Sequence, residues 1–298
     1  MLDNILNDTQ LNLLPGEAFT AAGSFGEKML DKISDAIGWA VIPKDTKKYR
    51  LEAEEYLIEQ IKKDEKMPPL AKAAYISKVR KIIKQYVNKC DICTQAMNYL
   101  DKNVASENVD AVEDDWLEFF FDKAQNVSKE DIQIIWAKLL AKEFEYPNSV
   151  SKQLLHILSV IDYEDATIFC KLVNLTILID EEPHLIVHYG YFEEFYSVQG
   201  VQQSDIFKLV DIGLLQSSST GYTTRIENGG KIKYFDYEMD IEGEDNIAIG
   251  NVLYSKAGAT LYSIISDKRK IDGMEKIIES SIGKDNLSFM LSQEQGSI

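Results

Sequence analysis

Residues 115–141 carry the strongest structural signal in the chain and read DWLEFFFDKAQNVSKEDIQIIWAKLLA. The first part of this stretch predicts a short aromatic-rich helix from Trp116 to Ala124. Ser128 and Asp131 have the spacing of a capping box, which predicts that a second helix starts there and continues through Leu140. The large aromatic side chains are expected in a helical core rather than in a ligand cage: Trp116, Phe119, Phe120, Phe121 and Trp136.

Three further helices are predicted before this stretch, at about Glu27–Val41, Thr46–Asp64 and Leu70–Leu100. Apolar residues recur in each at three- and four-residue steps, as in amphipathic helices. We expect the first helix to be buried against its neighbours; a membrane-surface position is disfavoured because its polar face mixes both charge signs. The third segment is long enough for one helix, or for two with a break near Asn88. The expected apolar face of the second helix consists of Leu51, Ala53, Tyr56, Leu57 and Ile61.

The third predicted helix carries a basic stripe, residues 72–89, opposite its apolar side. Its members are Lys72, Lys78, Arg80, Lys81, Lys84 and Lys89, with Tyr75 and Tyr86 among them. Such a stripe is usually the solvated face of an amphipathic helix. The alternatives are contact with a phosphate-rich surface, with an acidic helix, or with the acidic half of this chain or of a second copy.

The later part of the chain changes in texture, and the whole is expected to be α+β and mostly α. Residues 101–115 are acidic and are interpreted as a linker or the most exposed connection. Short helices follow at about Ser151–Leu158, Asp162–Val173, Asp205–Asp211 and Lys256–Ile265, the third capped by Ser204 and ended by Gly213. Strands are expected at Thr176–Ile179, His184–Tyr189, Leu214–Ser218, Lys231–Ile241 and Ile247–Tyr254.

This element order predicts a helical region followed by helices and a winged-helix-like unit with a small antiparallel sheet. The expected division is a loose leader at 1–23, a helical region at 24–105, a helical plus winged-helix-like region at 106–275 and a tail at 276–298.

Charge and composition exclude several classes of protein. The chain has 298 residues, 45% of them hydrophobic, and a formal net charge of −17. Residues 1–100 are near neutral, with 15 basic and 14 acidic residues, so almost all of the acidity follows Asp101. A field of this sign disfavours non-specific nucleic-acid binding. No apolar run reaches the length of a membrane span. Three cysteines and a start without a secretion signal favour a reducing, cytoplasmic location.

Isolated motifs are few, and each has an ordinary structural interpretation. Cys90 and Cys93 form a lone CxxC inside a helical pattern, so structural thiols are favoured over a metal or redox pair. His184 and His188 lie in a strand-like run without the residues of a zinc motif, and His156 is expected to be a packing or surface residue. No phosphate-binding glycine loop or nucleophile motif is found. We therefore assign no catalytic, cofactor-binding or metal-ligating residue and no cofactor.

Two stretches resemble a known group of proteins. One is Lys32–Trp39; the other is the opening stretch, continued by Pro147, Ser149, Leu154, Ile157, Leu158 and Asp165-Ala166. Together they resemble a bacterial family of unknown function that is distantly similar to the abortive-infection alpha (Abi-alpha) phage-defence proteins. The resemblance covers roughly residues 27–265, departs from the expected pattern at Phe144–Tyr146, and supplies no active-site residue.

Three function hypotheses follow. The resemblance implies a non-enzymatic, cytoplasmic phage-defence protein that acts through protein–protein contacts, as a homo-oligomer or with a partner protein. A winged-helix transcriptional or antitoxin-like regulator is the first alternative, although residues 201–298 hold 10 basic and 15 acidic residues and only Lys268-Arg269-Lys270 forms a basic cluster. A metal-dependent hydrolase or nuclease with dispersed carboxylates is the second.

Overall fold

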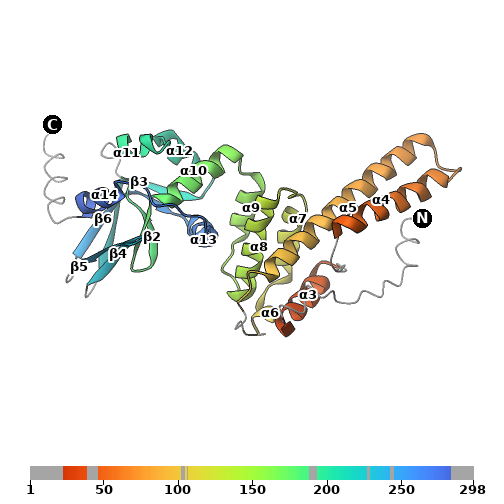
Figure 1. The fold of residues 1–298 in the computed structure, drawn as a ribbon, viewed down its shortest axis with the longest axis horizontal. Helices are drawn as coiled ribbons and strands as arrows, with labels where there is room; N and C mark the ends of the chain where they lie inside the picture. The colour runs from red at the N-terminus through yellow and green to blue at the C-terminus, as the bar shows by residue number, and fades with distance from the viewer. Residues whose placement is uncertain are drawn as a thin grey trace. The chain divides into compact units, whose positions relative to one another are not determined.

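The computed structural model describes residues 23–38, 46–101, 105, 107–187, 193–226, 229–241 and 245–282. Over these residues the chain is α+β and mostly α, as expected, and it divides into two compact units, Met1–Leu155 and His156–Ile298 (Figure 1). We call them the N-terminal and C-terminal units. The predicted leader up to residue 22 and the end of the tail from residue 283 lie outside the described residues, as do Trp39 and His188.

The N-terminal unit is built from helices. They are α3 (Gly23–Ile37), α4 (Thr46–Lys63), α5 (Pro69–Met97), α6 (Glu107–Ala111), α7 (Asp114–Ala124), α8 (Glu130–Glu145) and the first turns of α9 (Lys152–Val160). The long helix α5 is unbroken, so the predicted alternative of a break near Asn88 is wrong. It packs against α4 at one end and against α7 and α8 at the other (Figure 1).

Four of the five aromatic residues singled out in the opening stretch form the core of this unit, as predicted. Phe119 is only partly buried, and Lys123 Nζ lies 5.2 Å from the centroid of its ring. The ring of Phe120 lies 5.1 Å from Trp116, 5.1 Å from Phe121 and 5.2 Å from Trp136, measured between centroids. All four side chains are buried. Trp116 also donates its indole N–H to the carbonyl of Val150 at 2.7 Å, which links α7 to the segment before α9. Burial of rings this large dominates the stability of a small helical core.

The start of α8 differs from the prediction. Its N-cap is Lys129, and no side chain caps the helix there, so the predicted Ser128 capping box is wrong. The Ser128 hydroxyl oxygen instead accepts a hydrogen bond from Asn88 Nδ2 at 3.3 Å. A contact with α5, distant in the sequence, has replaced the local bond that the spacing suggested.

Helix α3 and the acidic segment both contribute to the same core. Met29 and Ile33 of α3 are fully buried, as predicted for an amphipathic helix packed against its neighbours. The segment 101–115 was expected to be a linker, yet it contains α6, and Val109 and Val112 are buried. Its acidic side chains from Glu107 onward are exposed, as expected.

The C-terminal unit combines helices with two antiparallel sheets. Its helices after α9 are α10 (Tyr163–Asn174), α11 (Glu193–Val198), α12 (Gln203–Asp211), α13 (Lys256–Ile264) and α14 (Met274–Ile282). Its strands are β1 (Thr176–Ile179), β2 (Glu182–Leu185), β3 (Leu215–Ile226), β4 (Gly230–Tyr234), β5 (Tyr237–Ile241) and β6 (Asp245–Tyr254). One sheet has the order β2-β1-β4-β5, and the other pairs β3 with β6.

The winged-helix-like order is present, with an addition. Helix α12 is followed by two long paired strands, β3 and β6, and then by α13. Between these strands the chain forms the β4–β5 hairpin, which joins β1 in the other sheet. The single strand predicted at Lys231–Ile241 is therefore wrong: the chain reverses at Phe235, whose φ is +51°. Helix α14 was not predicted; Met274 and Ile278 are buried in it.

The turn between α12 and β3 follows the prediction for Gly213, which has φ +89°. The amide of Gly213 bonds the Val210 carbonyl, and the amide of Leu214 bonds the Leu209 carbonyl, so the helix ends in a Schellman motif. At its start the helix is capped by Gln202 with Asp205 rather than by Ser204, so that capping prediction is wrong.

Candidate interaction surface

Helices α4 and α5 form a hairpin that extends away from the other helices of the N-terminal unit (Figure 1). We call residues 46–84 the arm. Its turn is fixed by local bonds: the Lys66 amide donates to Asp64 Oδ1 at 3.0 Å, and Lys72 Nζ donates to the Lys62 carbonyl at 2.8 Å. Pro69 occupies the first turn of α5, where its missing N–H costs nothing. These contacts fix the conformation of the turn between α4 and α5.

The arm has a small core. Only Ile58, Ile61 and Val79 are buried in its hydrophobic cluster, with Leu57, Met67, Ile76 and Ile83 partly buried around them. Helices in water draw most of their stability from packing of an apolar face rather than from intrinsic propensity. Three buried side chains are few for two helices, one of which, α4, is 18 residues long.

Large apolar side chains remain exposed on the arm. They are Tyr49, Leu51, Tyr56, Leu70, Tyr75 and Ile82. The predicted packed face of α4 is therefore wrong in part: Leu51 is 64% exposed and Tyr56 is 61% exposed, and only Leu57 and Ile61 turn inward as expected. Single exposed apolar residues are ordinary on protein surfaces, but a group on one element indicates a contact surface.

Charged side chains surround these apolar residues. Arg80 of α5 pairs with Glu54 of α4 at 3.1 Å, which holds the two helices together. Three members of the basic stripe, Lys78, Lys81 and Lys84, are exposed and form no ion pair with any residue that the structure describes. Glu52, Glu55 and Glu59 are exposed on α4. The arm thus presents both an acidic and a basic set of side chains.

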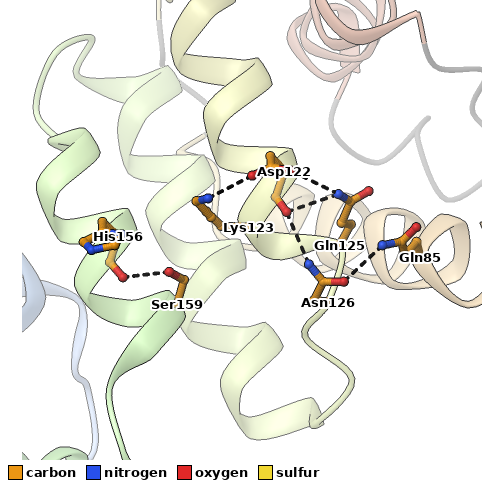
Figure 2. A network of polar contacts seen from close by, with 7 residues as sticks. All are labelled: Gln85, Asp122, Lys123, Gln125, Asn126, His156 and Ser159. Carbon is orange, nitrogen blue, oxygen red and sulfur yellow. Dashed lines mark hydrogen bonds and ion pairs between the residues drawn. The ribbon is translucent and has the colours of Figure 1, made fainter. Parts of the chain in front are cut away.

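A buried polar junction anchors the root of α5. Asn88 is buried and donates to the Gln125 carbonyl at 2.8 Å, in the loop between α7 and α8. Gln133 Nε2 donates to the Val127 carbonyl of the same loop at 2.9 Å. One turn earlier, Gln85 donates to the exposed side chain of Asn126 at 3.0 Å (Figure 2). These bonds fix the direction in which the arm leaves the core.

The CxxC pair lies inside this root rather than at a surface. Cys90 and Cys93 are buried within the continuous helix α5. Burial raises the pKa of the Cys93 thiol well above its ordinary value, and the charge of Lys89 lowers it by less. A protonated, buried thiol is a poor nucleophile. Among the described residues, no group of three or more His, Cys, Asp or Glu side chains is arranged to hold a metal ion.

The burial of this pair leads to a prediction about reactivity. In the native protein, a maleimide is expected to label Cys170, which is exposed, at least about ten times faster than Cys90 or Cys93. Mass spectrometry of the digested protein after timed labelling measures the three rates. Equal rates, or a loss of two hydrogens from the peptide with Cys90 and Cys93, would contradict the structural role.

The remaining predicted residues are spread through the C-terminal unit. His184 lies on β2, and burial lowers the pKa of its imidazole. Lys268 lies 3.4 Å from the ring centroid of Tyr262, whereas Lys270 pairs with Glu275 at 2.8 Å and with Asp236. The basic cluster at 268–270 is thus largely occupied by contacts inside the chain. His156 is exposed on α9, and its carbonyl accepts from the Ser159 hydroxyl at 2.7 Å (Figure 2).

One buried carboxylate escaped the sequence interpretation. Glu143 on α8 is 2% exposed, and its two oxygens accept the backbone amides of Asn148 at 2.7 Å and Val150 at 2.8 Å. Burial raises the pKa of this carboxyl, while the amides act in the opposite direction. Its contacts hold the turn at Pro147, where Asn148 has φ +67°. They give Glu143 a structural role in shaping this turn.

The fold and the arm together define an α+β protein with a projecting helical hairpin. Residues 78–277 match the family described as "Protein of unknown function (DUF2806)", and the chain belongs to that family. Helix α4 and the first turns of α5 precede the matched range. No curated protein and no solved structure matched the chain. In the part of the chain that the structure describes, no helix combines the length and apolar content needed to cross a bilayer.

Proposed function

We propose that the chain is a non-enzymatic bacterial defence protein of the abortive-infection type, which acts in the cytoplasm through protein–protein contacts. The observation that carries the contact role is the arm, on which six large apolar side chains stay exposed around a small core. The defence role is supported by the resemblance of Lys32–Trp39 and of residues within 115–166 to a bacterial family of unknown function that is distantly similar to the Abi-alpha proteins. The arm supplies the surface through which such a protein engages its partner.

Phage plating tests this proposal. Bacteria that carry the gene are expected to reduce plating of some phages by several orders of magnitude relative to an empty vector. The paired substitution Leu51→Ser with Tyr56→Ser, on the arm, is expected to abolish that reduction, because both side chains are exposed and belong to the proposed contact surface. A control pair, Val160→Ser with Tyr163→Ser, removes from the C-terminal unit two large apolar side chains that are at least about as exposed, and it is expected to leave the reduction in plating intact.

Unchanged plating over a broad phage panel, repeated with the neighbouring genes present, would contradict the defence role. Protection that survives the arm substitutions would show instead that the arm is not the contact surface.

The winged-helix-like order of α12, β3 and β6 favours one second candidate, a DNA-binding regulator. The residues that contact DNA in such a regulator would have to lie outside 268–270. In that cluster Lys268 stacks on the ring of Tyr262, and Lys270 forms ion pairs with acidic side chains. An electrophoretic mobility shift that persists in 200 mM salt would support this candidate, because non-specific phosphate contacts weaken steeply with salt. The third candidate, a metal-dependent hydrolase or nuclease, predicts a rise in melting temperature on addition of a divalent metal.

A further inference from the structure

We propose that the arm is a dimerisation element whose partner is the arm of a second copy of this chain. The two arms pack side by side as a four-helix bundle, with α4 of each copy against α5 of the other. This inference rests on the proposed role of the arm as the contact surface, and it names the partner. Two properties of the arm support it: the spacing of its exposed apolar residues and the placement of its charges.

The exposed apolar residues repeat at the spacing of a helix–helix contact. Tyr49 and Tyr56 are seven residues apart on α4, and Tyr75 and Ile82 are seven residues apart on α5. Seven residues are close to two helical turns, so each pair marks one side of its helix. Helix α4 is about 27 Å long at 1.5 Å per residue, which is long enough for several layers of bundle packing. A second arm supplies the apolar surface that the small core lacks.

The charges of the arm complement each other between copies. Glu52, Glu55 and Glu59 recur at three- and four-residue steps on α4, and Glu59 also pairs with the exposed Lys63 of the same helix at 3.5 Å. Lys78, Lys81 and Lys84 recur at three-residue steps on α5 and form no ion pair with a described residue. In a two-fold interface every contact occurs twice, so one acidic set and one basic set on the same arm satisfy both halves. An acidic set and a basic set on the same arm make the arm self-complementary, which favours a second copy as the occupant.

A charge-swap experiment on the full-length chain tests the dimer. The acidic-set variant carries Glu52→Lys, Glu55→Lys and Glu59→Lys; the basic-set variant carries Lys78→Glu, Lys81→Glu and Lys84→Glu. Sedimentation velocity at micromolar concentration is expected to show a dimer for the unaltered chain. Each variant alone is expected to have a dissociation constant raised at least about 100-fold, because like charges then face each other.

Mixing the two variants, or combining all six substitutions in one chain, is expected to restore the dimer, because opposite charges face each other again. The matched control makes the same charge change on exposed lysines outside the arm: Lys129→Glu, Lys152→Glu and Lys256→Glu. It is expected to remain dimeric. If circular dichroism shows that a triple variant does not fold, the double variant Tyr56→Ser with Ile82→Ser gives a second test. Both side chains are exposed in the single chain, so their loss is expected to weaken the dimer without changing the fold of the monomer.

A monomeric unaltered chain overturns the inference, as does a dimer that survives both charge reversals or a mixture of the folded variants that stays monomeric. These measurements involve no phage, so their failure is separate from failure of the defence proposal. A dimer without any effect on plating would contradict only the defence role. A monomer that protects against phage would contradict only the dimer.

Discussion

Replacing Gly258 with alanine is expected to lower the free energy of unfolding of the C-terminal unit by about 3 kcal/mol or more. An added Cβ at this position would lie 2.0 Å from the Leu214 carbonyl oxygen, which is backbone and has no rotamer to change. The first turn of α13 is held against that carbonyl. The Ser255 amide donates to it at 3.1 Å, and the Ser255 hydroxyl donates to the Gly213 carbonyl at 2.6 Å.

The sign of this effect is informative, because alanine normally stabilises a helix relative to glycine by about 1 kcal/mol. Ser263→Ala, on the exposed side of the same helix, serves as the control and is expected to change the free energy by less than about 0.5 kcal/mol. Trp116 and Trp136 are buried in the N-terminal unit, so their fluorescence reports that unit, and far-UV circular dichroism in urea reports both units. If the Gly258→Ala protein is as stable as the unaltered chain, helix α13 cannot lie as close to the Leu214 carbonyl as the structure places it.

Helical periodicity predicted the elements of the N-terminal unit because burial itself has that period. Met29 and Ile33 are four residues apart and are both fully buried in α3. Trp116 and Phe120 have the same spacing in α7, and their rings stack. A turn was predicted correctly where a single residue determines its geometry, as at Gly213, whose positive φ ends α12.

Helical periodicity did not predict whether another element covers the apolar face of a helix. Leu51 and Tyr56 follow the helical pattern of α4, but among the described elements the main packing partner of α4 is α5, and both side chains stay in solvent. The sequence therefore singled out the basic stripe of the candidate surface and missed its apolar part.

Strand pairings between residues that are distant in the sequence could not be predicted from local patterns either. Strand β1 pairs with β4, placing Ile179 opposite Ile232, more than fifty residues later. The tight turn between β1 and β2 has two non-glycine residues, Asp180 and Glu181, at positive φ. The amino-acid composition of this turn does not suggest a tight hairpin. Such arrangements are selected by long-range packing and leave little trace in local patterns.

A second large effect is expected in the N-terminal unit, at the polar junction at the root of α5. Replacing Asn88 with alanine is expected to lower the free energy of unfolding of that unit by about 2 to 3 kcal/mol. The substitution removes the donor to the Gln125 carbonyl at 2.8 Å and to Ser128 Oγ at 3.3 Å, both in a part-buried position, and the Asn88 side chain itself is buried. An acceptor stripped of its donor keeps its desolvation cost, and the lost side chain leaves a cavity.

Gln85→Ala is the matched control for Asn88→Ala, because both residues are amides on α5 that donate to the loop between α7 and α8. Figure 2 shows the bond from Gln85 to Asn126. The bond from Gln85 to Asn126 is exposed, and water replaces it at little cost, so a loss below about 0.5 kcal/mol is expected. Urea unfolding followed by tryptophan fluorescence compares the two. If they cost the same, burial is not what makes the junction strong. If only Asn88→Ala is costly, the buried amide is what fixes α5, and with it the arm, to the helical core.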